Sequence, residues 1–326
     1  MRRGHAEVAS ALLRTAWDGD RTLMSAAATL ARCLGLSLGR FDEAHAVLDQ
    51  ASLEGVVRGD DSQTGAGSPG GRNRGRTNEF LDVVRSELHL EQGEFEQARV
   101  LAEQVLGTSR SRSTRVAASA ALARVYNHDG LAASERGSPD EALFLFKRAA
   151  DLDPSWSGPH VNMGAIFALL DRPERALNAY RAAVAIEPHD PVALLEYGLL
   201  LYRTGDPAAA CDILEHAVEC DSSAPDAASA LCHVLIDVGA TERAVEILAS
   251  AVEAHPSRAS LWTQLGVALL ADHQIDDAEA CWRRAIDLDP DDREACARLA
   301  DLLSREGRYH EAALLAERAQ REPAPE

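Results

Sequence analysis

The side chains that could bind a metal ion gather near one segment of the second half of the chain. His216 and Cys220 are four residues apart, Cys211 precedes them, and Cys232 and His233 follow. Imidazole nitrogens and thiolates are the usual ligands of tetrahedral zinc. However, Cys232 occupies a position where small residues recur, and Cys211 and Cys220 do not share a helical face. We therefore interpret these cysteines as small buried side chains, and we predict neither a metal site nor a cofactor.

Serine, histidine and aspartate residues are plentiful, but no strand pattern leads into any of them. A phosphate-binding loop and a nucleophile elbow each need a strand followed by a tight turn and a helix. The acidic pairs Asp276 with Asp277 and Asp291 with Asp292 stand at predicted helix starts, where carboxylates interact favourably with the helix dipole. We expect these side chains to be structural, and we predict that the chain is not an enzyme.

The elements that carry these residues repeat along the second half of the chain. Alanine recurs there every 34 residues in two columns. A constant period of roughly 20 to 50 residues is typical of a solenoid, in which each unit buries its apolar face against its neighbours. The first column contains Ala142, Ala176, Ala210, Ala244, Ala278 and Ala312, and the second contains Ala149, Ala183, Ala217, Ala251, Ala285 and Ala319.

Each repeat also combines a small residue with a bulky one. The small residue precedes the first alanine by twelve positions, and the bulky one usually follows that alanine by four. Small residues let two helices approach closely, and large apolar side chains fill the space between helix pairs. The small residues are Gly130, Gly164, Gly198, Cys232, Gly266 and Ala300, and the bulky ones are Phe146, Tyr180, Leu214, Leu248 and Trp282, with Ala316 as the exception. The pattern predicts antiparallel helix pairs.

These repeats resemble the tetratricopeptide repeat family. The best match runs from residue 157 to 190, where Gly164, Phe167, Tyr180 and Pro188 fit the family pattern. The departures are Asp129 for Leu, Cys232 and Ala300 for Gly, and Ser222 and Ala324 for Pro. The resemblance implies an all-α fold, namely a right-handed superhelical solenoid of antiparallel helix pairs with a concave groove that binds a ligand.

The repeat pattern divides the chain into four parts. Residues 1–54 contain N-terminal helices with one degenerate repeat, and residues 55–78 form a loop rich in Gly, Ser and Arg, which we expect to be flexible. Residues 79–122 contain a second degenerate repeat and a connection, and residues 123–326 contain six repeats in register.

Two features of the first half leave alternatives open. The arginines of the predicted loop, Arg72, Arg74 and Arg76, could dock an acidic partner or nucleic acid instead of forming part of a passive loop. The spacing from Ala98 to Ala142 exceeds the period by ten residues. That surplus belongs either to a Ser/Arg-rich connection at residues 107–114 or to a longer helix that runs towards residue 136.

Charge and composition limit the classes of partner. The formal net charge is −19, from 52 acidic and 33 basic side chains. Such a charge repels phosphate backbones and anionic lipids, so we expect no general nucleic-acid binding and no membrane insertion. No apolar run approaches the ~18 residues that span a bilayer. The N-terminus lacks the continuous apolar core of a secretion signal, and the six cysteines form no CxxC pair, which favours a cytoplasmic location.

The resemblance places the partner-binding residues on the first helix of each pair. Counting from the small-residue column gives a surface with an apolar middle and a rim of amides and charges. Its predicted members are Asn127, Asn162, Leu195, Leu199, Tyr202, Arg203, His233, Gln264 and Arg298. The family's clamp for acidic peptide ends needs several Lys or Arg beside Asn, and this set lacks them.

The leading hypothesis is a non-enzymatic scaffold whose groove binds a segment of a protein or peptide partner. The alternative is a regulatory or substrate-docking portion of a larger enzyme or transcriptional regulator, for example one associated with a glycosyltransferase. Self-association through the C-terminal end of the array is a further expectation, because solenoids generally need a polar terminal unit.

Overall fold

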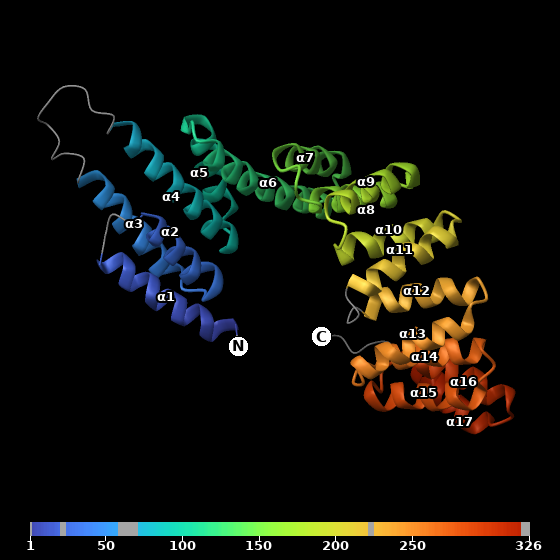
Figure 1. The fold of residues 1–326 in the computed structure, drawn as a ribbon. Coiled ribbons are helices and arrows are strands. Elements are labelled where there is room, and N and C mark those ends of the chain that lie inside the picture. The colour runs from blue at the N-terminus through green and yellow to red at the C-terminus, as the bar shows by residue number, and fades with distance from the viewer. Residues whose placement is uncertain (1, 20–23, 58–70, 221–224, 321–326) are drawn as a thin grey trace, which may run out of the picture. The chain divides into compact units, whose positions relative to one another are not determined.

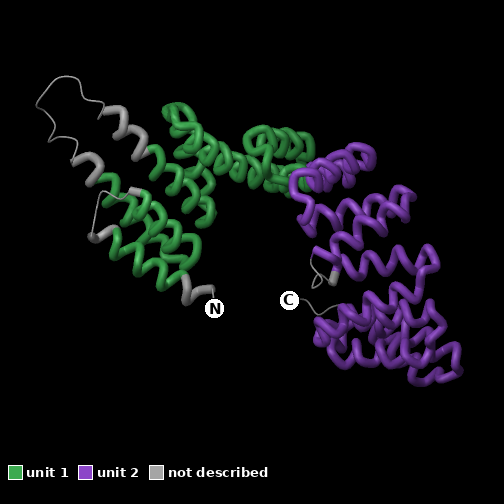
Figure 2. The backbone as a smooth tube through the Cα atoms, in the orientation of Figure 1, with its two compact units in different colours: residues 1–162 green, residues 163–326 purple. Residues whose placement is uncertain are grey.

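The computed structural model describes residues 2–19, 24–57, 71–220 and 225–320, and every regular element in these ranges is a helix (Figure 1). The predicted all-α fold is confirmed. The chain forms two compact units, residues 1–162 and residues 163–326 (Figure 2). The four-part division stays a prediction, since these units follow spatial contacts rather than the repeat pattern.

Unit 1 begins with less regular helices and ends with a repeat of the predicted type. Its helices are α1 (Arg2–Gly19), α2 (Met24–Arg32), the π-helical turn η1 (Cys33–Ser37), α3 (Phe41–Val57), α4 (Gly71–Glu91), α5 (Phe95–Thr108), α6 (Arg112–Glu135) and α7 (Pro139–Leu152). Leu30, Leu34, Leu48 and Leu88 form the centre of a core that joins α2, η1, α3 and α4. Helix α8 (Gly158–Leu169) contains the boundary between the units.

The helices extend into the predicted loop from both sides. Residues 55–57 belong to α3 and residues 71–78 belong to α4, so helix covers more of this segment than its composition indicates. Arginine has a high helix propensity, which is consistent with the early start of α4. Residues 58–70 and the side chains of Arg72, Arg74 and Arg76 lie outside the described part of the chain, so the docking alternative stays untested.

The surplus of ten residues before Ala142 belongs to a long helix. Helix α6 has 24 residues and begins only four residues after the end of α5. The Ser111 side chain accepts a hydrogen bond from the backbone N–H of Thr114 and caps the start of α6. Of the two alternatives for this segment, the lengthened helix is therefore correct.

Unit 2 consists of helix pairs at the predicted period. After α8, its helices are α9 (Pro173–Ile186), α10 (Pro191–Arg203), α11 (Pro207–Cys220), α12 (Pro225–Asp237), α13 (Thr241–Ala254), α14 (Ala259–Ala271), α15 (Ile275–Leu288), α16 (Arg293–Arg305) and α17 (Tyr309–Gln320). Each even-numbered helix is the first of a pair and the odd-numbered helix after it is the second. Four of these helices begin with proline, whose fixed φ suits the first helical position. Asp190 caps α10 by accepting from the N–H groups of Val192 and Ala193.

Candidate binding surface

The first helices of the pairs line the inner side of unit 2. Cα atoms of α10 and α12, of α12 and α14, and of α14 and α16 approach within 8 Å of one another. Within the described residues, the backbones of the second helices do not approach in this way, and long side chains bridge them instead. Examples are the ion pairs Arg243–Glu215 at 2.8 Å and Arg283–Glu311 at 2.6 Å. Unit 2 therefore curves with α10, α12, α14 and α16 on its concave face.

Close packing inside each pair fixes the orientation of this inner face. A Cβ atom added to Gly198 would lie 2.6 Å from Leu214, and one added to Gly266 would lie 2.5 Å from Nε1 of Trp282. The small and bulky columns thus contact each other within one helix pair, sixteen residues apart. Trp282 is fully buried, and its indole N–H donates to the carbonyl of Thr263. Because these positions face the partner helix, the residues on the opposite side of each first helix face outward.

The apolar middle of the predicted surface lies on α10. Leu195, Leu199 and Tyr202 are half-buried, whereas Arg203 is exposed. The hydroxyl of Tyr202 donates to the carboxylate of Asp237 on α12, which holds the ring across the two neighbouring first helices. Helix α10 therefore has partly accessible apolar side chains in its middle and an exposed arginine at its C-terminal end.

The remaining predicted residues of unit 2 form a polar rim. His233 on α12 and Arg298 on α16 are exposed, and Gln264 on α14 is half-buried. The Gln264 amide donates to Glu294 at 3.3 Å, and Arg298 forms an ion pair with the same carboxylate at 3.3 Å. The structure thus brings Gln264 and Arg298 together around Glu294, a residue that the sequence prediction omits.

The two asparagines of the predicted surface, Asn127 and Asn162, belong to unit 1. The Asn162 side chain donates to Oδ1 of Asn127 at 2.8 Å and links α8 to α6. Each amide therefore already has a partner, and this bond stabilises the contact of two first helices. Their assignment to partner binding stays a prediction.

Comparison with known families supports the interpretation of these repeats. Residues 190–323, which span α10 to α17, match a tetratricopeptide repeat family model. This part of unit 2 is therefore similar to the tetratricopeptide repeat family.

Solved structures resemble parts of this chain at low sequence identity, and one of them, PilF, has a TM-score above 0.5. PilF of Pseudomonas aeruginosa is 19% identical with a TM-score of 0.51, over 60% of this chain and 88% of PilF. YrrB, described as a protein with an unusual peptide-binding site, is 21% identical with a TM-score of 0.44, over 52% of this chain and 88% of YrrB. MamA from Desulfovibrio magneticus RS-1 is 23% identical with a TM-score of 0.44, over 51% of this chain and 97% of MamA. A search of curated proteins found no match.

The repeats also carry an arginine-lined hollow that the sequence prediction missed. In unit 1, Arg110 and Arg112 line two overlapping cavities of about 730 and 720 Å³, and Arg115 lines the first of them; Asp153 and Ser155 line both. The hollow lies where α5 meets α6 and where the chain leaves α7. The sequence shows that residues 107–114 are rich in Ser and Arg. Only the three-dimensional structure shows that these arginines line one hollow.

Two cysteines of unit 2 and one serine motif of unit 1 lack the surroundings that activate a nucleophile. Burial raises the pKa of Cys232 to about 12 and that of Cys281 to about 11, so these thiols stay protonated and unreactive. Residues 35–39 do have the Gly-x-Ser-x-Gly spacing of a nucleophile elbow, which the prediction above overlooked. They form η1 and the turn before α3, so no strand leads into Ser37 and no elbow results.

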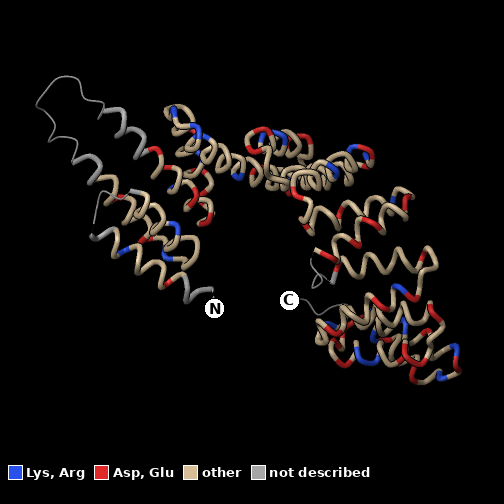
Figure 3. Tube along the Cα trace, viewed as in Figure 1, with Lys and Arg blue, Asp and Glu red and all other residues tan. Residues whose placement is uncertain are grey.

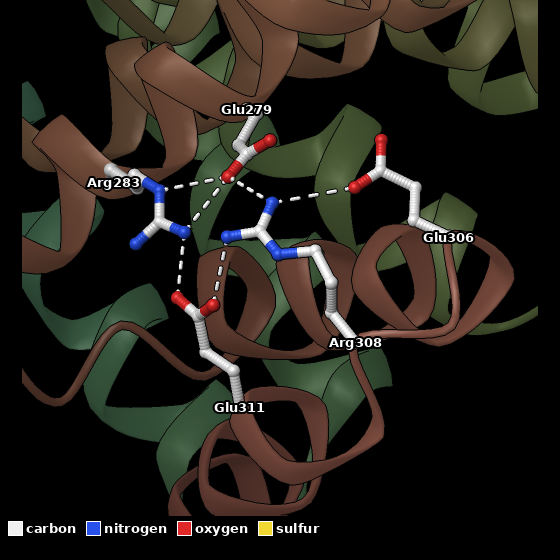
Figure 4. Close-up of polar contacts among 5 residues, drawn as sticks. All are labelled: Glu279, Arg283, Glu306, Arg308 and Glu311. Carbon is white, nitrogen blue, oxygen red and sulfur yellow. Dashed lines mark hydrogen bonds and ion pairs between the residues drawn. The ribbon is translucent and has the colours of Figure 1, made fainter.

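A network of ion pairs joins α15 to α17 and to the turn before α17. Glu279 on α15 accepts hydrogen bonds from Arg283 and Arg308, and Glu311 on α17 accepts from the same two arginines (Figure 4). Arg308 also contacts Glu306 at 3.3 Å. The network links α17 to α15, so charged side chains cover the surface between these two helices.

No helix in the described part of the chain is long and apolar enough to cross a membrane.

Proposed function

We propose that unit 2 is a non-enzymatic interaction scaffold whose concave face binds an extended or helical segment of a protein partner. The observation that carries this proposal is the row of first helices, which presents Leu195, Leu199 and Tyr202 at its middle and polar side chains around them. Burial of these apolar side chains would provide most of the affinity. The polar rim would select the partner and its orientation.

The charges on this face favour a segment that has basic residues beside an apolar centre. Glu196, Asp237, Glu294 and Asp301 lie on the first helices, and Arg298 and Arg305 are already paired with Glu294 and Asp301. Acidic side chains also outnumber basic ones in the chain as a whole and occur on both units (Figure 3). A cationic segment would therefore be attracted over long range, and its association would slow as salt is raised.

Substitutions on the two faces of unit 2 test this proposal. The double change Leu199→Asp with Tyr202→Asp places charge in the apolar middle and should abolish partner binding. The matched control, Ala208→Asp with Ala280→Asp, adds the same two charges to exposed positions on the second helices α11 and α15. Partners captured from the source cells are then compared by mass spectrometry, and circular dichroism checks that helicity is retained. If the inner-face variant keeps every partner of the wild type, the concave face is not the binding surface.

The alternative function, a docking portion of a larger enzyme or regulator, predicts a stable assembly. Native mass measurement of the purified complex distinguishes the two. A fixed stoichiometric partner that carries a catalytic or DNA-binding domain would support the alternative. A set of exchangeable partners that compete for the concave face would support the scaffold. Self-association stays an expectation that the same measurement tests.

The arginine-lined hollow of unit 1 favours a second binding role, for an acidic segment. Three guanidinium groups around one hollow attract carboxylates in an otherwise acidic protein, and arginine binds them in a bidentate geometry. A fluorescent oligoglutamate peptide should bind the wild type and lose affinity in Arg112→Glu with Arg115→Glu. The same change at Arg172 and Arg175, two exposed arginines of unit 2, should leave binding unchanged.

A further inference from the structure

Three metal-binding side chains meet in unit 2 beside the loop between α9 and α10. His189 belongs to this loop, and His216 and Cys220 lie one helical turn apart on α11. Nδ1 of His189 is 3.3 Å from Sγ of Cys220. One ligand atom from each of the three residues lies within 4.8 Å of the other two, and no other His, Cys, Asp and Glu side chains of the described chain form such a group.

We propose that His189, His216 and Cys220 bind a Zn²⁺ ion. Zinc binds imidazole nitrogen at 2.0–2.1 Å and thiolate sulfur at about 2.3 Å in tetrahedral geometry, which places two ligand atoms about 3.3–3.7 Å apart. The separation of 3.3 Å between His189 Nδ1 and Cys220 Sγ lies in this range, and the His216 nitrogen, within 4.8 Å of both atoms, would move closer by side-chain rotation when the ion binds. The two imidazole rings are nearly perpendicular, at 84°, with centroids 5.4 Å apart, so they do not stack and each can direct a nitrogen to a common point.

Packing explains three of the other cysteines better than it explains this group. Cys232, Cys281 and Cys296 are buried, as expected of small apolar side chains. His189 is exposed and fills no core position, yet its ring nitrogen lies against the Cys220 thiol. Cys220 also packs against the apolar cluster of Leu194, Ala217 and Ala227, so apolar side chains border one side of the site. The prediction of no metal site is based on residues of the helical repeats, whereas His189 lies in a loop.

The chemistry of the group suits zinc in a solvent-facing site. On binding, Cys220 releases its proton to solvent and coordinates as the thiolate, while the two histidines coordinate as neutral imidazoles. These ligands leave a net charge of +1 and a fourth position open to water or an external ligand. Because His189 lies on the loop before α10 and the other two residues lie on α11, the ion would join two successive helix pairs.

Metal titration of the reduced, chelator-treated full-length chain tests this proposal. Calorimetry with Zn²⁺ should show one equivalent bound, and Co²⁺ as a spectroscopic probe should show a thiolate-to-metal charge-transfer band. Cys220→Ser should lose that band. His189→Ala should weaken Zn²⁺ binding by more than the about 10–100-fold typical of losing a second-shell partner. Zn²⁺ should also raise the melting temperature of the wild type and not that of Cys220→Ser.

Two matched controls separate this site from general metal binding. Cys211→Ser removes another half-buried thiol of α11, and His233→Ala removes an exposed histidine of α12, and both should bind Zn²⁺ like the wild type. The proposal is overturned if the charge-transfer band survives in Cys220→Ser, or if His189→Ala binds Zn²⁺ as tightly as the wild type. Since His189 is an exposed loop residue, its removal should not affect folding, and the test stays decisive even if Cys220→Ser is unstable. Failure here would leave the scaffold proposal intact, because the two use different residues.

Discussion

The helix pairs α14–α15 and α16–α17 share the register of the repeat but have different residues at their central contact. In α14–α15, Gly266 provides space that the indole of Trp282 fills completely. In α16–α17 the equivalent positions are Ala300 and Ala316, so no large ring lies between the helices. Instead, α17 is tied to α15 by the ion pairs of Arg283 and Arg308 with Glu279 and Glu311 (Figure 4). A repeat can therefore keep its register with a small residue at the bulky position, while ion pairs join its second helix to that of the preceding repeat.

The largest expected effect comes from emptying the core of α14–α15. Trp282→Ala removes a fully buried ring and its hydrogen bond to Thr263, and it should cost about 3–5 kcal/mol of unfolding free energy. Urea denaturation followed by circular dichroism measures the loss. Trp262→Ala is the control, because Trp262 is only half-buried and its indole N–H donates to the Pro256 carbonyl at the surface. An equal loss in the two variants would show that the small-and-bulky contact does not dominate this pair.

A smaller change at the opposite position should also be costly. Gly266→Ala brings a Cβ atom to 2.5 Å from Nε1 of Trp282, and this buried ring has no room to move. We expect a loss of about 1–3 kcal/mol from overpacking. If space were available, the same change would stabilise the helix by about 1 kcal/mol, because alanine has the higher helix propensity. The sign of the effect therefore decides whether the contact is as tight as the structure indicates.

The sequence predicted the register of the helix pairs but not all of their contacts. The alanine columns and the prolines predicted the positions of the helices of unit 2 along the sequence, because a fixed period requires the same contact in every repeat. The length of α6 was undecided, since Ser and Arg residues occur in both loops and helix starts. The hydrogen bond between Gln264 and Glu294 was not found, because it joins side chains of different repeats. The proximity of His189 to Cys220 was missed for the same reason, as 31 residues separate them.

The turns of the two pairs offer a third and smaller test. His273 in the α14–α15 turn has φ of 62°, and Gly307 in the α16–α17 turn has φ of 82°. The left-handed conformation costs an L-residue roughly 1–2 kcal/mol, partly offset by the greater backbone entropy that glycine loses. His273→Gly should therefore raise the unfolding free energy by about 0.5–1 kcal/mol, and Gly307→Ala should lower it. Thermal melting of both variants measures the effects, and a loss of stability in His273→Gly would contradict this account.

The smallest expected effect is the response of the ion-pair network to acid. Hydrogen bonds from Arg283 and Arg308 hold the pKa of Glu311 below its ordinary value of 4.5. Burial alone would raise the pKa of Glu279, but hydrogen bonds from the same arginines outweigh it and the pKa is lowered. A carboxyl group with a lowered pKa stabilises the folded state above its unfolded pKa, and that contribution is lost as the pH falls through the folded pKa.

Acid should therefore loosen α17 before it affects α14 and α15, and only below about pH 4.5. Hydrogen exchange of the backbone amides, followed by mass spectrometry at several pH values and corrected for the intrinsic rate, measures the opening of each helix separately. High salt at neutral pH should produce a weaker version of the same change, since these partly exposed pairs are screened. Arg308→Met removes the central cation, so α17 in this variant should exchange faster at neutral pH and respond less to acid. If α17 and α14 lose protection together in the wild type, the network does not hold the last helix pair, and its stability must come from the buried side chains of Ala312 and Leu315.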